Sequence, residues 1–347
     1  MTDATCLDLL LAGQSPPILG VGLIGSGSAQ AAQVISNDQL SQRVDTNDEW
    51  IRTRTGIGRR RVSTPGQSLV DLAAEAGQGA LTMAGRSPQD LDLILLATST
   101  PDDLFGSAPR VQAELGATNA VAFDLTAACS GFLFAVVTAA QYLRTGAMRR
   151  ALVIGADQLS RFVDWDDRRS CVLFGDGAGA VLLETTHQDG LLGFQLQSDG
   201  SRGAVLNLPA VDIAAPLVDG AEHRAGGYRP IEMNGQEVYK FAVREVPAVL
   251  QSLLKRCDVS PDQLDWLLLH QANQRILDAV ADRLSLPRTK VLSNLSSYGN
   301  TSAATIPLML DEAVRDGRIR SGDLLASSGF GAGLSWGAAL LRWQGPA

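Results

Sequence analysis

Residues 120–143 read AVAFDLTAACSGFLFAVVTAAQYL. The apolar run 120–125 predicts a buried strand, the small residues after it predict a turn, and residues 130–143 have the pattern of a helix. The same order recurs along the chain, with strands expected at 93–98, 151–154, 178–184, 266–270, 291–295, 324–327 and 338–343, and helices at 68–84, 107–115, 235–256, 274–284 and 302–316. Short buried strands that alternate with longer helices indicate an α/β fold.

The second half of the chain weakly repeats the first. LDLILL at 91–96 resembles LDWLLL at 264–269, and this offset of 173 residues pairs Cys129 with Ser302, each before an expected helix. We therefore expect a leader at 1–17, one α/β half at 18–190 and a second at 191–347. Residues 185–234, rich in Gly, Asp, Ala and Pro, look like a loop-rich joint without a counterpart. Chance likeness between two α/β units is the alternative to duplication.

Composition narrows the class of protein. Of 347 residues, 45% are apolar and 19% charged, which excludes a disordered chain, and the net charge of −8 argues against a broad nucleic-acid surface. We expect no membrane insertion, because no apolar run reaches about 18 residues. The four cysteines form no CxxC pair and the three histidines no HxxxH pair, so we expect no zinc site or disulfide scaffold. A cytoplasmic protein fits this pattern best.

Cys129 is the candidate nucleophile. It lies at the start of an expected helix, where the helix dipole and free backbone N–H groups favour a thiolate and stabilise an oxyanion. Its small neighbours leave room for a substrate. A buried, inert thiol is the alternative, and Cys171 fits that description better because it lies in a plain apolar run.

His270 and Asn300 are the candidate partners. His270 ends the strand expected at 266–270, and Asn300 lies in SYGNTS at 297–302, ahead of a helix. In α/β folds such strand ends are common ligand sites. A lone histidine there is also often structural, and the asparagine is also a plausible turn residue or helix cap. All three residues end strand–loop–helix units, an arrangement that would bring them to one crevice.

Five motifs give the sequence its resemblance to a known family. They are DTNDEWI at 45–51 with RTGI at 54–57, AACSGF at 127–132, FGDGAGA at 174–180, HQAN at 270–273 and GNTSAA at 299–304. In this order, within 18–343, they resemble the β-ketoacyl-acyl-carrier-protein synthase III family, the initiating condensing enzymes of type II fatty-acid synthesis. The resemblance implies a thiolase-like fold, in which two duplicated α/β halves form a layered αβαβα sandwich, and a homodimer.

The resemblance also implies an acyltransferase reaction. Cys129 would take an acetyl group from acetyl-CoA, and malonyl-acyl-carrier protein would lose CO₂ and attack that thioester to give acetoacetyl-acyl-carrier protein. His270 and Asn300 would stabilise the oxyanion of decarboxylation, and the backbone N–H groups of Cys129 and Ala332 that of acyl transfer. No metal or organic cofactor is implied. A related enzyme that uses another acyl primer for a secondary metabolite is the alternative.

Further roles follow from the resemblance alone. The implied CoA contacts are Thr46, Trp50, Arg54, Arg168 and Asn273. Phe105 would close the acyl pocket of a partner subunit and favour a short primer. Carrier-protein docking would involve Lys240, Arg275 and Arg283, although Asp282 stands where relatives are often basic.

Three other classes fit less well. A papain-like hydrolase also uses Cys, His and Asn, but its signature around the cysteine is absent. An inactive module of the same fold would be expected to lack one of these residues. Among sister condensing enzymes, elongating synthases carry a second His in place of Asn, hydroxymethylglutaryl-CoA synthases use a Glu, and plant-type polyketide synthases lack the segment 48–51.

Overall fold

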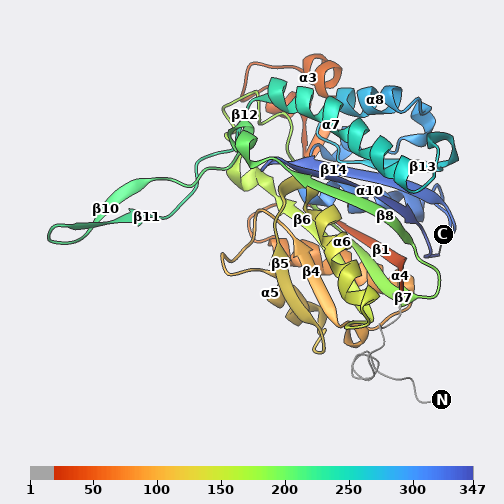
Figure 1. Cartoon of the computed structure of the whole chain (residues 1–347). Helices are drawn as coiled ribbons and strands as arrows, with labels where there is room; N and C mark the ends of the chain where they lie inside the picture. The colour runs from red at the N-terminus through yellow and green to blue at the C-terminus, as the bar shows by residue number, and fades with distance from the viewer. Residues whose placement is uncertain (1–18, 347) are drawn as a thin grey trace.

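Two mixed β-sheets organise residues 19–346, the part of the chain that the computed structural model describes (Figure 1). The first has the order β1 (Gly20–Gln30), β7 (Asp176–Thr186), β6 (Arg150–Gln158), β4 (Leu93–Ala97) and β5 (Val121–Leu125). The second has the order β13 (Trp266–Leu269), β14 (Leu324–Gly331), β15 (Ser335–Arg342) and β8 (Leu191–Ser198). In both sheets the strands at one end are parallel and the others antiparallel.

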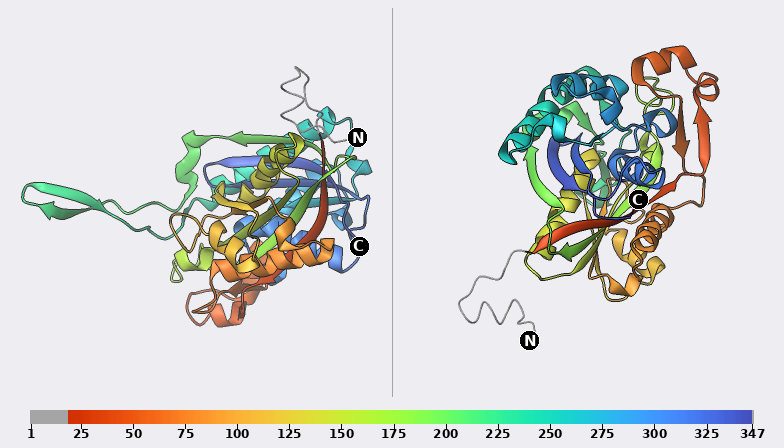
Figure 2. Two further views of the ribbon diagram at one scale, coloured as in Figure 1. Left: turned by 90° about the horizontal axis from the view of Figure 1, so that it is seen from below. Right: turned by 90° about the vertical axis from the view of Figure 1, so that its right-hand side faces the viewer.

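Helices form three layers around the two sheets, as Figures 1 and 2 show. The central layer holds α6 (Gly131–Arg144) and α10 (Thr305–Arg315), whose apolar side chains share one buried core with strands of both sheets. The outer face of the first sheet packs on α4 (Leu69–Ala84) and α5 (Ala108–Leu115), and that of the second on α7 (Gly235–Arg256) and α8 (Gln274–Arg283). The predicted α/β class and layered thiolase-like sandwich are thereby confirmed.

Local sequence signals set the helix boundaries. The α4 helix begins after Ser68, whose side chain accepts from the Asp71 amide while the Asp71 carboxylate accepts from the Ser68 amide. This reciprocal cap satisfies donors that the first helical turn leaves free. The helix ends at Gly85, which has a φ of 61°, a left-handed conformation that glycine adopts without strain.

The two sheets repeat one connectivity. The second sheet has the same order and directions of strands as part of the first sheet. Its strands β13, β14, β15 and β8 correspond in turn to β4, β6, β7 and β1. Two short 3₁₀ turns, η2 (Ala128–Ser130) and η7 (Ser302–Ala304), precede the central helices at equivalent places. The strands of the first sheet lie within 18–190 and those of the second within 191–347, and we keep this division into halves as a proposal. The leader expected at 1–17 lies outside the described residues.

Two expectations about the second half were wrong. The segment 291–295 is not a strand: Val291 forms a single bridge with Leu267, and α9 (Leu295–Tyr298) follows. The Gln271 side chain accepts hydrogen bonds from the amides of Asn294 and Leu295, which diverts these donors from strand pairing. The supposed joint at 185–234 contains β8, a full member of the second sheet.

The remainder of that segment leaves the body of the molecule. The hairpin of β10 (Ile213–Val218) and β11 (Ala221–Ala225) projects outward, and its base is joined by β9 (Leu206–Asn207) and β12 (Glu232–Met233) (Figures 1 and 2). A small unit of β2 (Gln33–Ser36), α2 (Asn37–Leu40), α3 (Asp48–Thr55) and β3 (Arg59–Val62) packs on the body of the molecule, where Leu40 and Ile51 share a core with Phe174. Among the helices of residues 19–346, none has the length and hydrophobicity to cross a bilayer.

Candidate active site

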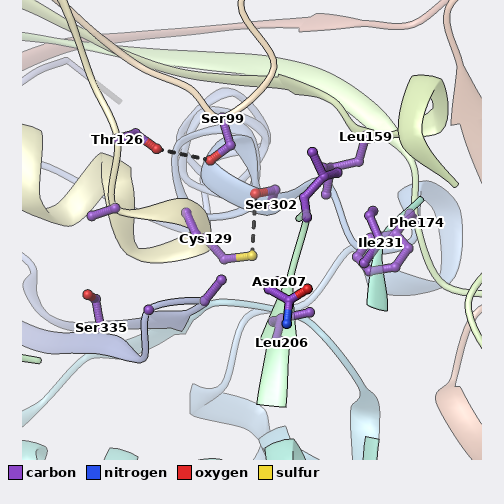
Figure 3. Close-up of a pocket in the computed structure, with 15 residues that line it drawn as sticks. Ser99, Thr126, Cys129, Leu159, Phe174, Leu206, Asn207, Ile231, Ser302 and Ser335 are labelled. Carbon is purple, nitrogen blue, oxygen red and sulfur yellow. Dashed lines mark hydrogen bonds between the residues drawn. The ribbon is translucent and has the colours of Figure 1, made fainter. Parts of the chain in front are cut away.

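Cys129 lies in the wall of a cavity of about 370 Å³ that is lined by residues from 99–174 and from 206–335 (Figure 3). The turn η2 follows β5 and leads into α6, so the cysteine stands at the start of a central helix as expected. Most of the lining is apolar or small: Ser99, Thr126, Ala127, Ala128, Leu159, Phe174, Leu206, Asn207, Leu208, Ile231, Ser302, Ala332, Gly333 and Ser335. Cys129 is 8% exposed, and it contributes to the wall of this cavity.

Ser302 joins the predicted residues into one cluster. Its Oγ lies 3.3 Å from the Cys129 Sγ (Figure 3), and its backbone N–H donates to Asn300 Oδ1 at 2.9 Å. The Ser302 backbone also raises the pKa of the His270 ring, against the larger effect of burial. The structure therefore brings Cys129, His270 and Asn300 together around a residue that the resemblance did not assign to the site.

Asn300 is held by its backbone groups and its side-chain oxygen. Its backbone N–H donates to Leu173 O at 2.8 Å, and its carbonyl accepts from the Gly175 N–H at 2.9 Å. Because Oδ1 accepts from the Ser302 amide, the side-chain nitrogen is identified by geometry. Within residues 19–346 no acceptor is bonded to that nitrogen.

Burial determines the protonation states of the cluster. It lowers the pKa of His270 to about 3, against a smaller opposite effect of the Ser302 backbone, so the ring is neutral at pH 7. Burial also raises the pKa of the Cys129 thiol to about 12, and this exceeds the opposing hydrogen bond from Ser302. Desolvation therefore opposes the stabilisation of the thiolate that the helix start is expected to give.

The predicted backbone donors lie on the cavity wall. Ala332 lines the cavity beside Cys129 and follows Gly331, the last residue of β14. A Cβ atom at position 331 would lie 2.7 Å from the Cys129 nitrogen, closer than side chains approach, so only glycine allows this contact. The close approach places the backbone at 331 directly against that of Cys129.

The predicted CoA contacts cluster around α3. The guanidinium groups of Arg54 and Arg168 lie 5.0 and 5.4 Å from the ring centroid of Trp50, within the range of cation–π contact. Asn273 donates to Arg54 O at 3.0 Å, which links α3 to the start of α8. The Thr46 hydroxyl is buried and has no hydrogen-bond partner within the described chain.

Phe105 lies on an apolar surface beside the cavity. It is 99% exposed in the loop between β4 and α5. A second hollow reaches from Phe105 past Phe123 to Ser99 and Thr126, two residues that also line the Cys129 cavity.

The three predicted docking residues do not all lie together. Lys240 of α7 pairs with Glu237 at 2.8 Å, and the Arg275 guanidinium of α8 lies 5.7 Å from the ring of Tyr239. Arg283 lies eight residues further along α8, roughly 12 Å away. Asp282, which weakened the expected basic patch, is paired with Arg288 at 2.9 Å.

Two features of the site escaped the sequence reasoning. The Ser302 hydroxyl touches the nucleophile, and the 173-residue offset that pairs Ser302 with Cys129 was the available signal. The buried Asp157 accepts from the amide of Ala303, next to Ser302, and nothing in the apolar run around it pointed to the site. No group of three or more His, Cys, Asp or Glu side chains suited to a metal ion occurs in residues 19–346.

Comparison with known proteins gives consistent matches. The family described as 3-oxoacyl-[acyl-carrier-protein] synthase III matches residues 123–200, and its C-terminal region matches 254–343. The β-ketoacyl-[acyl-carrier-protein] synthase III of Synechococcus sp. (strain WH7803) is 91% identical over 336 residues, which are 97% of this chain and 100% of that protein. Its counterpart in Prochlorococcus marinus (strain MIT 9313) is 73% identical over 94% of this chain and 97% of the relative.

Solved structures agree with these relatives. The 3-oxoacyl-[acyl-carrier-protein] synthase III of Aquifex aeolicus VF5 superimposes with a TM-score of 0.86 at 41% identity, over 93% of this chain and 100% of that one. The priming β-ketosynthase of the R1128 polyketide pathway has the same TM-score at 32% identity, over 96% of this chain and 99% of the other.

Proposed function

The chain belongs to the 3-oxoacyl-[acyl-carrier-protein] synthase III family of condensing acyltransferases, and we propose that its cavity joins acetyl-CoA to malonyl-acyl-carrier protein to initiate fatty-acid synthesis. One observation carries the proposal: the Cys129 sulfur lies in an apolar cavity beside Ser302, to which Asn300 and His270 are tied. A primer for a secondary metabolite is not favoured, because the polyketide priming enzyme is 32% identical whereas the family relative is 91% identical.

The first half-reaction transfers the acyl group. The Cys129 sulfur attacks the carbonyl carbon of acetyl-CoA, the carbonyl oxygen becomes an oxyanion, and the CoA thiolate leaves. The backbone N–H groups of Cys129 and Ala332 are the proposed donors to that oxyanion, and the close contact of Gly331 with the Cys129 backbone supports this pairing. The apolar lining suits a short acyl chain without its own hydrogen-bonding groups.

The second half-reaction removes CO₂ and forms the new C–C bond. As the malonyl carboxylate leaves as CO₂, its electron pair moves to the thioester oxygen as an enolate. Neutral His270 and the free amide donors of Asn300 are the proposed partners of that oxygen. The carbanion form of the enolate then attacks the acetyl group on Cys129, and the cysteine leaves as a thiolate.

The CoA nucleotide is proposed to bind at α3. The aromatic face of Trp50, with a guanidinium group over it, suits a planar purine, and Arg168 would move to admit the base between them. Arg168 is half-exposed and is held by Asp45 O at 2.8 Å, so this movement costs little packing. Arg54 would bind phosphate, and Thr46, with its unpartnered hydroxyl, and Asn273 would contact the rest of the molecule.

A homodimer is proposed on the basis of surfaces that a single chain leaves apolar. The edge strand β5 exposes Val121 and Phe123 next to Phe105. The hairpin β10–β11 exposes Ile213 and Leu217, together with Val218, and an isolated two-stranded ribbon is only marginally stable in water. A second copy would cover these surfaces and receive Phe105 at its own acyl cavity. Sedimentation equilibrium would test this, and a monomer at micromolar concentration would contradict it.

The carrier protein is proposed to dock on α7 and α8. An acidic carrier would be repelled by the chain's overall charge of −8, so a local basic surface must attract it. Arg275 of α8 contacts Tyr239 of α7, and Lys240 is the next residue of α7, so these two basic residues are the proposed centre of the surface. Arg283 would lie at its edge. A cytoplasmic location remains part of the proposal.

Radiolabelled acetyl-CoA tests the proposed nucleophile. We expect one acetyl group per chain on the peptide that contains Cys129, and none on Cys129→Ser. Addition of malonyl-acyl-carrier protein should convert the label to acetoacetyl-acyl-carrier protein. Stable label on Cys171 or Cys257, or a preference for a long acyl-CoA over acetyl-CoA, would contradict the assignment.

A further inference from the structure

A short helix connects the surroundings of the two residues proposed to hold the decarboxylation oxyanion. His270 and Gln271 follow β13, and Asn300 comes two residues after the end of α9 (Leu295–Tyr298). A helix of one turn has too few internal hydrogen bonds to be stable alone, so contacts with its surroundings determine its position. The side chains that make these contacts therefore also influence where Asn300 stands.

Gln271 binds the start of this helix. It is fully buried next to His270, and its Oε1 accepts from the backbone amides of Asn294 and Leu295, each at 2.9 Å. Because these partners are donors, the other end of the Gln271 amide is its nitrogen, which donates to Asn294 Oδ1 at 2.9 Å. The Asn294 nitrogen in turn donates to Glu312 Oε2 at 2.8 Å. Each amide in this chain of hydrogen bonds thus has one orientation that satisfies its neighbours.

Glu312 of α10 holds both ends of the helix. Its Oε2 accepts from Asn294, which precedes α9, and its Oε1 accepts from the hydroxyl of Tyr298, the last residue of α9. Gln30 of β1 donates to the Tyr298 oxygen and so holds the ring from the first half of the chain. Glu312 forms no ion pair in residues 19–346, so both of its oxygens serve these uncharged donors. Hydrogen bonds to a charged acceptor are roughly twice as strong as neutral ones.

Only one residue separates this helix from Asn300. Gly299 has a φ of 69°, and a Cβ atom there would lie 2.7 Å from Leu173 O, so the chain has no room to adjust at this point. A displacement of Tyr298 is therefore passed on to Asn300 rather than absorbed between the two residues.

We propose that Glu312 is a positioning residue for decarboxylation, which sets the spacing of His270 and Asn300 by fixing both ends of α9. The inference rests on the proposed function of those two residues. At one end the carboxylate acts through Asn294 on the segment that follows His270, and at the other it fixes the turn that leads to Asn300. Glu312 does not line the Cys129 cavity, so no chemical step passes through it.

Separate assays of the two half-reactions test the inference. In Glu312→Gln the side chain keeps its shape but has one accepting oxygen, so one end of α9 loses its bond. The kcat for CO₂ release from malonyl-acyl-carrier protein should fall about tenfold or more, with KM unchanged, because a displacement of about 1 Å costs about 10²-fold. Acetyl transfer from acetyl-CoA to Cys129 should stay within twofold, since the hydrogen bonds of Glu312 do not involve the backbone at Cys129 or Ala332.

Asp311→Asn is the matched control for a loss of stability. Asp311 precedes Glu312 on α10 and is buried, and its bonds go to Ser26 and Ser28 of β1 and to Arg315, away from α9. This substitution should lower Tm at least as much as Glu312→Gln does, while both half-reactions stay within twofold of the wild type. The pair of variants thereby separates general destabilisation from loss of positioning.

Tyr298→Phe is a milder second variant, which decides the question alone if Glu312→Gln does not fold. It removes only the hydroxyl and keeps the ring beside the Arg61 guanidinium, 5.5 Å from the ring centroid. CO₂ release should fall about fivefold or more, because a charge-assisted bond is lost. Equal losses in both half-reactions, or CO₂ release within twofold of the wild type in both variants, would overturn the inference alone. A wild-type protein that releases no CO₂ would overturn the proposed function and the inference with it.

Discussion

A single methyl group at position 155 would show how strongly activity depends on the contact between β6 and η7. Gly155 lies on β6, two residues before Asp157, and a Cβ atom there would stand 2.2 Å from Ala303 O and 3.2 Å from Phe132 Cβ. Ordinary carbon–oxygen contacts are about 3.3–3.6 Å, so η7 would have to retreat by about 1 Å. That turn carries Ser302, and Asn300 lies two residues before it.

The expected loss follows from this displacement. A shift of about 1 Å in catalytic groups costs about 10²-fold in rate, whereas overpacking a core costs about 1–3 kcal/mol of stability. Gly155→Ala should therefore lower kcat for acetoacetyl-acyl-carrier protein formation about 100-fold, with a Tm only a few degrees lower.

Gly200→Ala is the matched control, because its Cβ would meet no atom within 4 Å. Condensation rate and Tm should match the wild type. Wild-type kcat and Tm in Gly155→Ala would refute the reasoning, since they would mean that η7 yields without consequence for the site.

Four further outcomes are expected. His270→Ala and Asn300→Ala should retain acyl transfer but lose about 10²–10³-fold in malonyl decarboxylation, measured as released CO₂; equal losses in both half-reactions would contradict the assignment. In the unfolded chain His270 is protonated below about pH 6.5, whereas in the folded protein it stays neutral down to about pH 3. The free energy of unfolding should therefore fall as the pH drops between these values, because the unfolded state binds the additional proton. His270→Gln should flatten this slope in chemical denaturation, and an identical slope would refute burial as its cause. Phe105→Ala should shift preference toward longer acyl-CoAs in a competition assay, by about 1–3 kcal/mol per methylene at most, and an unchanged ratio would remove Phe105 from the pocket. Lys240→Glu and Arg275→Glu should raise KM for malonyl-acyl-carrier protein and leave acetyl transfer unchanged, with an effect that weakens in salt; unaltered KM at low salt would place docking elsewhere.

The fold was largely predictable because its core strands are short apolar runs between capped helices. The strand at 266–270 and the helix after Cys129 follow from local pattern, and the motifs in family order led to the layered sandwich. The errors arose where local pattern is ambiguous. Residues 291–295 are apolar enough for a strand, yet the Gln271 side chain takes their backbone donors. The strand β8 was hidden in a segment whose overall composition is that of a loop.

The candidate site was only partly predictable. Cys129, His270 and Asn300 each end a unit that local sequence identifies, but Asp157 lies within an apolar strand and reads as one more core position. Its neighbour Ala303 is 146 residues away and meets it only when the halves pack together. The pKa of Cys129 likewise depends on burial by the whole fold, which a helix-start argument does not contain.

The residues of the site are far apart in the sequence, so they are synthesised at different times. Cys129 precedes Ser302 by 173 residues, so at about 5–20 residues per second the ribosome completes the cysteine roughly 9–35 s before the serine. During that interval neither the α10 helix nor the turn at Gly331 exists to cover the thiol. A nascent chain therefore carries an open cysteine without its partners, and neither acylation nor condensation begins until nearly the whole chain has been synthesised and folded.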